Sequence, residues 1–274
     1  MARELLKSFA ANPPLALKLL DESGFLSELL PEVTAMKYCP QPPEFHSEGD
    51  VFEHTMLALD VIGGDNWREF FNETKPTLNA ILGILLHDIG KPLTLKTPER
   101  DGTDRIRTNE HDIVGAKLVP EICERLKLTS YVDPKYGQIE PSGVAWLVQH
   151  HLLLVHGRPQ TLKPATIYRY FLKDAALGLA LQQVICADAC ASFPPGGKPD
   201  ADLLRELRTR FPEIEMKLSS GKLILLLSGD DIMANLNIEP GPKIGELLRA
   251  VEEAQLENKI SSRDEALKYL KELL

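Results

Sequence analysis

The sequence lacks several features that mark particular protein classes. None of its apolar runs approaches the roughly 20 residues that a membrane-spanning helix needs; the longest are Ile81–Leu86 and Leu223–Leu227. The N-terminus lacks the apolar segment of a signal peptide. The four cysteines contain no CxxC spacing, so reduced, structural thiols are expected. These absences predict a cytoplasmic protein with no membrane partner.

Positive charge is also in short supply. The chain has 31 Lys and Arg residues against 40 Asp and Glu residues, which gives a formal net charge of -9. Affinity for a phosphate backbone comes from Lys and Arg displacing counterions. The charge therefore argues against avid nonspecific binding of nucleic acid, although it leaves room for a local basic patch.

What the sequence does contain is helical periodicity. Its 274 residues, 43% of them hydrophobic, can bury one large core or two modest ones. Apolar residues recur at three- and four-residue intervals along nearly the whole chain, which predicts an all-α fold. Helices are expected at residues 3–11, 14–22, 51–61, 77–88, 109–126, 141–153, 164–191 and 200–211, from residue 229, and at 243–257 and 261–274.

Helix-breaking residues predict where these helices begin and end. Asp50 is the expected N-cap of the third helix, and Gly63-Gly64 its terminator. The proline-rich segment before residue 50 and the run Pro194–Pro199 are expected connectors. These breaks predict three domains, at residues 1–49, 50–193 and 200–274. Polar residues 92–107 are expected to form a loop over a site, as a substrate lid.

The most informative pattern is the pair His87-Asp88 at the end of an apolar run. Five of the seven histidines form one series with this pair and with Asp188, in helix-like apolar patterns: His54, His87, His111, His150 and His151. His46 and His156 are left without a role. Imidazole and carboxylate ligands suit Mn, Fe, Co, Ni or Zn. Such ions lower the pKa of bound water to about 7 and stabilise charge on a phosphoryl oxygen. This is the chemistry of phosphate-ester hydrolysis.

The order His54, His87-Asp88, Asp188 resembles the signature of the HD-domain metal-dependent phosphohydrolases, and His87–Lys91 resembles their HDIG variant. The resemblance implies a helical bundle in which these four residues hold one divalent metal. Family members with additional histidines hold two ions bridged by the aspartate of the pair. His111 and either His150 or His151 fall where those histidines occur. Two ions of Mn, Fe, Ni, Co, Zn or Mg are therefore expected.

The resemblance also implies roles beyond the metal ligands. Lys91 resembles the family lysine that contacts the substrate phosphate, so Asp88 and Lys91 are the expected catalytic residues. Arg158 and Arg169 could add a phosphate contact through a bidentate fork; ordinary solvated arginines are the alternative. His150 and His151 point about 100° apart on a helix, so only one of them is expected to face the metals.

The flanks carry a second resemblance, to bacterial tRNA nucleotidyltransferases that add CCA. It rests on residues 16–46 before the HD region and on Leu227–Met233, Pro240–Leu248 and Arg263–Leu267 after it. The catalytic head of that family is not expected, because nothing before residue 16 could house its Gly-Gly turn and paired carboxylates. Nucleotide addition is therefore not predicted, whereas tRNA binding is left open.

Taken together, these patterns predict a metal-dependent phosphohydrolase acting on a phosphate ester such as a nucleotide or cyclic nucleotide. Phosphodiesterase and phosphatase activity stay as alternatives, because specificity depends on loop contacts such as residues 92–107. From a different class, the alternative is a tRNA- or RNA-binding module whose metal site only stabilises the fold. For His87 and Asp88 the matching alternative is a buried hydrogen-bonded pair at a helix end.

Overall fold

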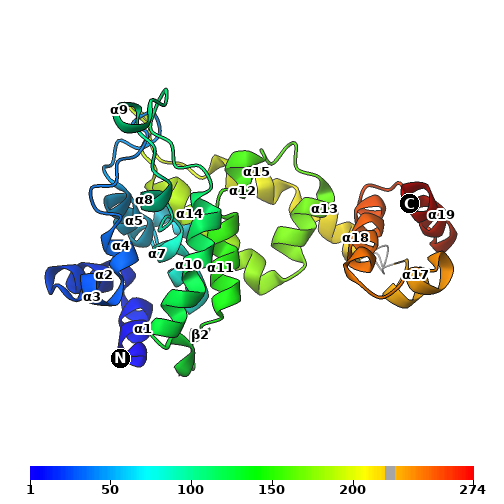
Figure 1. Ribbon diagram of the computed structural model, residues 1–274, viewed down its shortest axis with the longest axis horizontal. Helices are drawn as coiled ribbons and strands as arrows, with labels where there is room; N and C mark the ends of the chain where they lie inside the picture. Colours follow the sequence, from blue (N-terminus) through cyan, green and yellow to red (C-terminus); the bar gives the residue numbers. More distant parts are fainter. Residues whose placement is uncertain (220–225) are drawn as a thin grey trace. The chain divides into compact units, whose positions relative to one another are not determined.

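The computed structural model describes residues 1–219 and 226–274 (Figure 1). In this part of the chain nearly all regular structure is helical, and β1 (Val132–Asp133) and β2 (Gly137–Gln138) form one short antiparallel pair. The all-α prediction is confirmed. The apolar run expected from Leu223 lies outside the described residues except for Leu226 and Leu227.

The chain divides into two compact units. The first comprises residues 1–156 and 175–204, and the second comprises 157–174 and 205–274. These bounds differ from the predicted domains. Residues 1–49 pack into the same unit as the central bundle, because α1 and α2 contact α7 and α5. Residues 157–174 fall in the second unit.

The first unit is a helical bundle with short helices at its edges. Its helices are α1 (Ala2–Ala11), α2 (Pro13–Glu22), α3 (Phe25–Leu29), α4 (Pro31–Thr34), α5 (Val51–Asp60), α6 (Asp65–Phe71), α7 (Leu78–Leu86), α8 (Lys91–Thr94), α9 (Pro98–Asp101), α10 (His111–Arg125), the 3-10 turn η1 (Leu128–Ser130), α11 (Pro141–His150), α12 (Leu153–His156) and α14 (Ala175–Ala191).

The central helix of this bundle is α7. It contacts α1, α5, α11 and α14 (Figure 1), and eight of its nine residues are buried. A helix that is apolar on every side belongs inside a bundle. Its N-terminus is capped by the Thr77 side chain, which accepts from the Ala80 N–H at 3.2 Å. The helix therefore delivers its C-terminal residues, His87 and Asp88, into the interior.

The third expected helix, α5, begins where the sequence predicts. Asp50 and Glu53 form a capping box in which each side chain accepts a hydrogen bond from the other residue's backbone N–H. Its expected terminator is Gly63, which follows the end of α5 at Asp60 and adopts φ 82°. Because α5 packs against both α7 and α14, His54 on α5 is brought to the same place as the ends of those helices.

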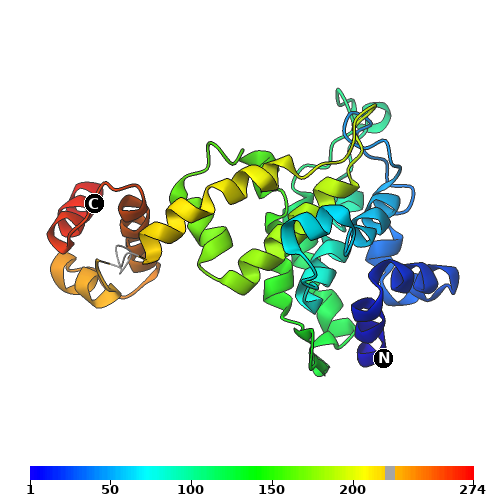
Figure 2. The same ribbon diagram turned by 180° about the vertical axis from the view of Figure 1, so that it is seen from behind.

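The second unit contains the shorter helices of the tail and one segment from the middle of the chain. Its elements are α13 (Pro164–Ile167), the π-helical turn η2 (Tyr168–Leu172), α16 (Phe211–Ser219), α17 (Gly229–Leu236), α18 (Pro242–Leu256) and α19 (Arg263–Leu273), while α15 (Asp202–Thr209) runs across the boundary between the units. Around its core, α17, α18 and α19 gather as the orange-to-red helices of Figure 2, and they bury Ile232, Val251 and Leu270.

The continuous helix expected over residues 164–191 is wrong. The chain forms α13 and η2, breaks at residues 173 and 174, and resumes as α14 at Ala175. The apolar pattern continues through this break because both pieces bury apolar residues, although they do so in different units. Lys173, the first residue after η2, forms an ion pair with Glu252 of α18 at 3.0 Å, which ties residues 157–174 to the tail.

Within the described residues, no helix is both long and apolar enough to cross a membrane.

Candidate metal centre

His87 and Asp88 lie at the C-terminal end of α7, where their side chains are almost completely buried. Asp88 is the meeting point of two groups of ligands. Its Oδ2 lies 3.2 Å from His87 Nε2 and 3.9 Å from His54 Nε2, whereas its Oδ1 lies 3.2 Å from His111 Nε2 and 3.7 Å from His151 Nε2. The two oxygens of one carboxylate therefore face two separate pairs of histidines.

The first group is completed by Asp188 on α14. Its Oδ1 lies 3.1 Å from His54 Nε2 and 3.7 Å from His87 Nε2, and the two Nε2 atoms are 3.3 Å apart. The second group holds His111 and His151, whose Nε2 atoms are also 3.3 Å apart. Each group keeps its ligand atoms close enough together to hold one ion.

The ring nitrogens of these histidines are divided between two tasks. The Nδ1 atoms of three of them donate to backbone carbonyls three residues earlier: His87 to Ile84, His111 to Thr108 and His151 to Val148, at 2.7–2.8 Å. The Nδ1 of His54 faces the carboxylate of Glu48 at 2.9 Å. In a neutral ring with Nδ1 protonated, Nε2 carries the lone pair. All four rings therefore present Nε2 to the centre.

The electrostatics of the centre favour ionised aspartates and a neutral His151. Burial opposes the charge on Asp88, but His87 and Lys91 beside it hold its pKa well below the usual range. Burial likewise opposes the charge on Asp188, whose pKa is lowered by the hydrogen bond from His54. Burial and the neighbouring rings lower the pKa of His151 to about 3. His54 differs: burial opposes its charge, but the hydrogen bonds to Asp188 and Glu48 raise its pKa to about 9. A metal ion would therefore have to displace a proton from its Nε2.

Asp88 itself shows that the donor set suits a cation. Both of its carboxylate oxygens are buried, and neither accepts a hydrogen bond from the residues that the structure describes. Lys91 Nζ lies 2.6 Å from Oδ2 as an ion pair. A buried carboxylate without hydrogen bonds is costly. Nitrogen and oxygen donors in this arrangement fit divalent ions of the Mn-to-Zn series.

Lys91 is buried and held from two sides. Besides its ion pair with Asp88, its Nζ donates to Gln41 Oε1 at 2.8 Å. The Gln41 amide in turn donates to the backbone carbonyls of Gly49 and Asp50. Gln41 could not be identified from the sequence, because a glutamine in a proline-rich connector carries no pattern that points to an interior position.

A cavity of about 510 Å³ opens onto this centre. Asp88, His111, His151 and Asp188 form part of its wall, with Lys91 beside them. The rest of the lining is mainly apolar and includes Phe45, Leu152, Leu154, Val155, Ile185 and Leu204, with Lys198 as a further cation. A ligand in this cavity would contact both the metal-ligating side chains and apolar side chains.

The structure places one of the two alternative histidines in the cluster, and it differs from one expectation, the lid. His150, the alternative to His151, lies outside the cluster; its Nδ1 donates to the Trp146 carbonyl at 2.8 Å, and its ring lies against the Trp146 ring. Residues 92–107, expected as a lid, form α8, α9 and an antiparallel bridge between Lys96 and Arg107. Their neighbours Lys91 and Thr108 line the cavity, whereas residues 92–107 themselves do not.

Arg158 and Arg169 belong to the second unit, and the substrate contact expected of Arg169 stays a prediction. Cys186 and Cys190, which flank Asp188, are buried and form no disulfide.

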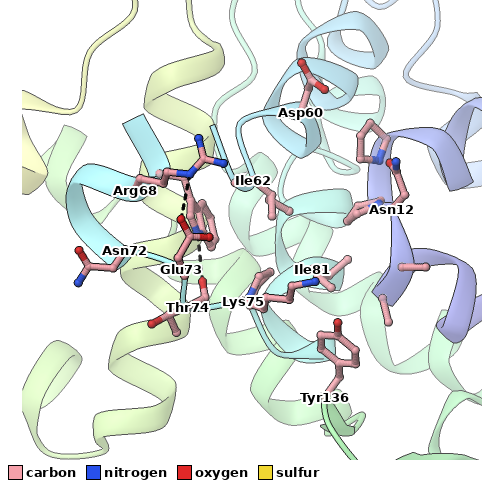
Figure 3. A pocket seen from close by; sticks show the side chains of 17 residues that line it. Asn12, Asp60, Ile62, Arg68, Asn72, Glu73, Thr74, Lys75, Ile81 and Tyr136 are labelled. Carbon is pink, nitrogen blue, oxygen red and sulfur yellow. Dashed lines mark hydrogen bonds and ion pairs between the residues drawn. The ribbon is translucent and has the colours of Figure 1, made fainter. Parts of the chain in front are cut away.

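A second cavity, of about 380 Å³, lies where α1 meets α2 and the residues after α5 (Figure 3). Some of its polar groups are engaged with one another, as the dashed lines show. Arg68 Nε donates to Glu73 at 3.3 Å, and the Trp67 indole donates to the Thr74 carbonyl at 3.0 Å. The cavity has no histidine in its lining, so the cluster around Asp88 is the stronger candidate for chemistry.

Comparison with known proteins gives two family matches. The model of the HD domain matches residues 52–191, and the model of tRNA nucleotidyltransferase domain 2 matches residues 202–270. Both lie where the sequence resemblances were placed.

Two curated relatives cover nearly the whole chain. The CC-adding tRNA nucleotidyltransferase of Thermus thermophilus is 29% identical over 270 residues, which are 98% of this chain and 54% of that protein. The A-adding tRNA nucleotidyltransferase of Deinococcus radiodurans is 29% identical over 254 residues, 92% of this chain and 52% of that protein. The chain thus spans about half the length of these relatives.

Proposed function

The chain belongs to the HD-domain family, and on this premise we propose that it is a metal-dependent phosphohydrolase acting on a nucleotide or cyclic nucleotide. One observation carries the proposal. Two groups of buried nitrogen and oxygen ligands meet at the two oxygens of Asp88, beside a cavity that a small phosphate ester can enter.

The proposed centre holds two divalent ions. His54, His87, Asp188 and Asp88 Oδ2 would hold one ion, and His111, His151 and Asp88 Oδ1 the other. Mn, Fe, Co, Ni and Zn suit this mixture of imidazole and carboxylate. When bound, such ions lower the pKa of a water molecule to about 7 and stabilise charge on a phosphoryl oxygen.

The chain's own residues contribute binding and orientation. The Lys91 ammonium is fixed by Asp88 and Gln41 at the cavity wall, so it can pair with a phosphate oxygen without being ordered first. The apolar side chains of the cavity lining would limit the water around the reacting group, which would strengthen this charge interaction. A volume of about 510 Å³ lies within the range of small-ligand sites, roughly 300–1,000 Å³.

The first experiment measures metal content and hydrolysis together. We expect the purified protein to retain divalent metal and to hydrolyse bis(4-nitrophenyl) phosphate or a cyclic nucleotide. His87→Ala and Asp88→Ala should lose metal and activity. His150→Ala is the matched control, because it removes a histidine from the same region outside the cluster, and it should retain both. Full metal content and full rate in His87→Ala and Asp88→Ala would contradict the proposal.

A second candidate function is a tRNA-binding module with a structural metal site. It is supported by the match of residues 202–270 to tRNA nucleotidyltransferase domain 2 and by relatives that are tRNA nucleotidyltransferases. The net charge of -9 opposes it. Binding of labelled tRNA that weakens linearly with the logarithm of salt concentration, without hydrolysis of any phosphate ester, would favour this candidate.

A further inference from the structure

We propose that Glu48 is a positioning residue of the metal centre, which holds His54 in the tautomer and ring orientation that leave Nε2 free for a metal ion. The inference rests on the proposed metal centre and assigns a role to a residue in the connector before α5, where the sequence showed no pattern.

Glu48 contacts His54 at Nδ1, the ring nitrogen that does not face the metal centre. Its Oε1 lies 2.9 Å from His54 Nδ1, and its side chain is only 2% exposed. Its other oxygen, Oε2, accepts from the backbone N–H of Phe193 at 2.9 Å. Ser47 strengthens the same attachment, because its backbone N–H and its hydroxyl both donate to the Phe193 carbonyl. Glu48 is thus fixed to the segment that follows α14, the helix carrying Asp188.

The need for Glu48 follows from where His54 lies in its helix. His87 and His151 lie at helix C-termini and His111 at a helix start, where a carbonyl three residues earlier can accept from Nδ1. His54 lies inside α5, where the carbonyl three residues earlier belongs to Val51 and already accepts from the Thr55 hydroxyl at 2.9 Å. His54 therefore depends on an acceptor from outside its helix.

A carboxylate in this position does more than a carbonyl would. It fixes the tautomer, orients the ring and raises the basicity of the nitrogen that faces the metal. Of the four histidines in the centre, His54 is the one whose Nδ1 meets a carboxylate.

A metal ion bound between His46, Glu48 and His54 is the alternative explanation, because their ligand atoms lie within 4.8 Å of one another. It would require His54 to present lone pairs on both ring nitrogens, which a neutral imidazole cannot do. The distances from Glu48 Oε1 to His46 Nδ1 and His54 Nδ1, 2.7 and 2.9 Å, are those of two N–H groups donating to one oxygen. Hydrogen bonding therefore explains the cluster better.

The test compares metal affinity in Glu48→Gln and Glu44→Gln. Both variants remove one negative charge from the same connector, but Glu44 is exposed. Affinity for Mn²⁺ is measured on metal-stripped protein by competition with a chelator. We expect Glu48→Gln to bind Mn²⁺ about 10- to 100-fold more weakly, the usual effect of removing such a partner, and Glu44→Gln to match the wild type. Equal affinity in Glu48→Gln and wild type would overturn the inference.

A double-mutant cycle separates positioning from general support of the fold. If Glu48 acts through His54, adding Glu48→Gln to His54→Ala should weaken Mn²⁺ binding no further. The same loss in both backgrounds would overturn the inference. If Glu48→Gln does not fold, ¹⁵N NMR of the metal-free wild type decides instead, at a pH well above the His54 pKa of about 9 so that the ring is neutral: a His54 ring protonated on Nε2 would overturn it. A wild type that binds no metal would refute the proposed function as well.

Discussion

At Gly90, the glycine of the His-Asp-Ile-Gly pattern, the structure leaves no room for a side chain. A Cβ atom there would lie 2.1 Å from the His111 carbonyl oxygen and 2.7 Å from the Gly115 nitrogen. Both are backbone atoms, so a change of side-chain rotamer cannot relieve the contact. The backbone at Gly90 has ordinary helical angles, and the requirement is therefore steric: glycine lets α10 approach closely enough for His111 to reach Asp88.

Gly90→Ala should therefore destabilise the first unit and weaken metal binding together. We expect the free energy of unfolding to fall by about 1–3 kcal/mol, as for overpacking elsewhere. Gly143→Ala is the matched control: its Cβ would meet Glu140 at an ordinary 3.6 Å inside α11, and it should gain roughly 0.5–1 kcal/mol. Urea unfolding measures the change in the free energy of unfolding for each variant. A loss of the same size in Gly90→Ala and Gly143→Ala would contradict the steric explanation.

The four cysteines are buried and form no disulfide. Burial raises the pKa of Cys39 and of Cys123 to about 11, so little thiolate is present at pH 8. We expect Ellman's reagent to label the native protein slowly at pH 8 and to label four thiols once urea is added. Rapid labelling of a native thiol would show that the packing around it opens readily.

Among the elements, α5 shows what the sequence could predict. The Asp50 cap is visible as a polar residue before an apolar periodic run, and the structure places the helix start there. The prediction succeeds because capping is a local interaction between residues three positions apart. The position of Glu48 behind His54 could not be predicted, since its anchor, Phe193, lies 145 residues away in the sequence.

Asp50→Ala tests this cap. Its carboxylate accepts from the Glu53 N–H at 2.9 Å and from the Tyr38 N–H at 2.6 Å, so the substitution should lower the free energy of unfolding by about 0.5–2 kcal/mol. Thr97→Ala, which removes the cap of the four-residue helix α9, should cost less than about 0.5 kcal/mol because that helix buries no residue. Urea unfolding of the two variants gives the comparison, and an equal loss would argue against a special role for α5.

At the scale of the whole molecule, the sequence predicted which residues converge but not how the chain divides. The histidines and aspartates could be grouped because their types and order suit one chemistry. The structure brings six of them together. The division at residues 157–174 could not be predicted, because the apolar stripe through Ile167 and Phe171 looks the same whether it is buried in one unit or the other.

The position of the centre within the first unit makes metal binding measurable by tryptophan fluorescence. The chain has two tryptophans, Trp67 on α6 and Trp146 on α11, and both lie in the first unit with every ligand of the centre. An ion that binds only the folded state at 100 times its Kd adds about 2.7 kcal/mol to the free energy of unfolding. We therefore expect Mn²⁺ to raise the urea midpoint of the fluorescence transition, and EDTA to reverse the rise.

Asp88→Ala separates binding at this centre from general effects of the ion. Its metal-free midpoint serves as its own baseline, because removing a carboxylate beside Lys91 changes stability by itself. Since Asp88 supplies a ligand atom to each group, Mn²⁺ should leave the variant's midpoint where it was. A shift as large as that of the wild type would mean that the ion binds the folded protein elsewhere, and the two-ion centre would then be wrong.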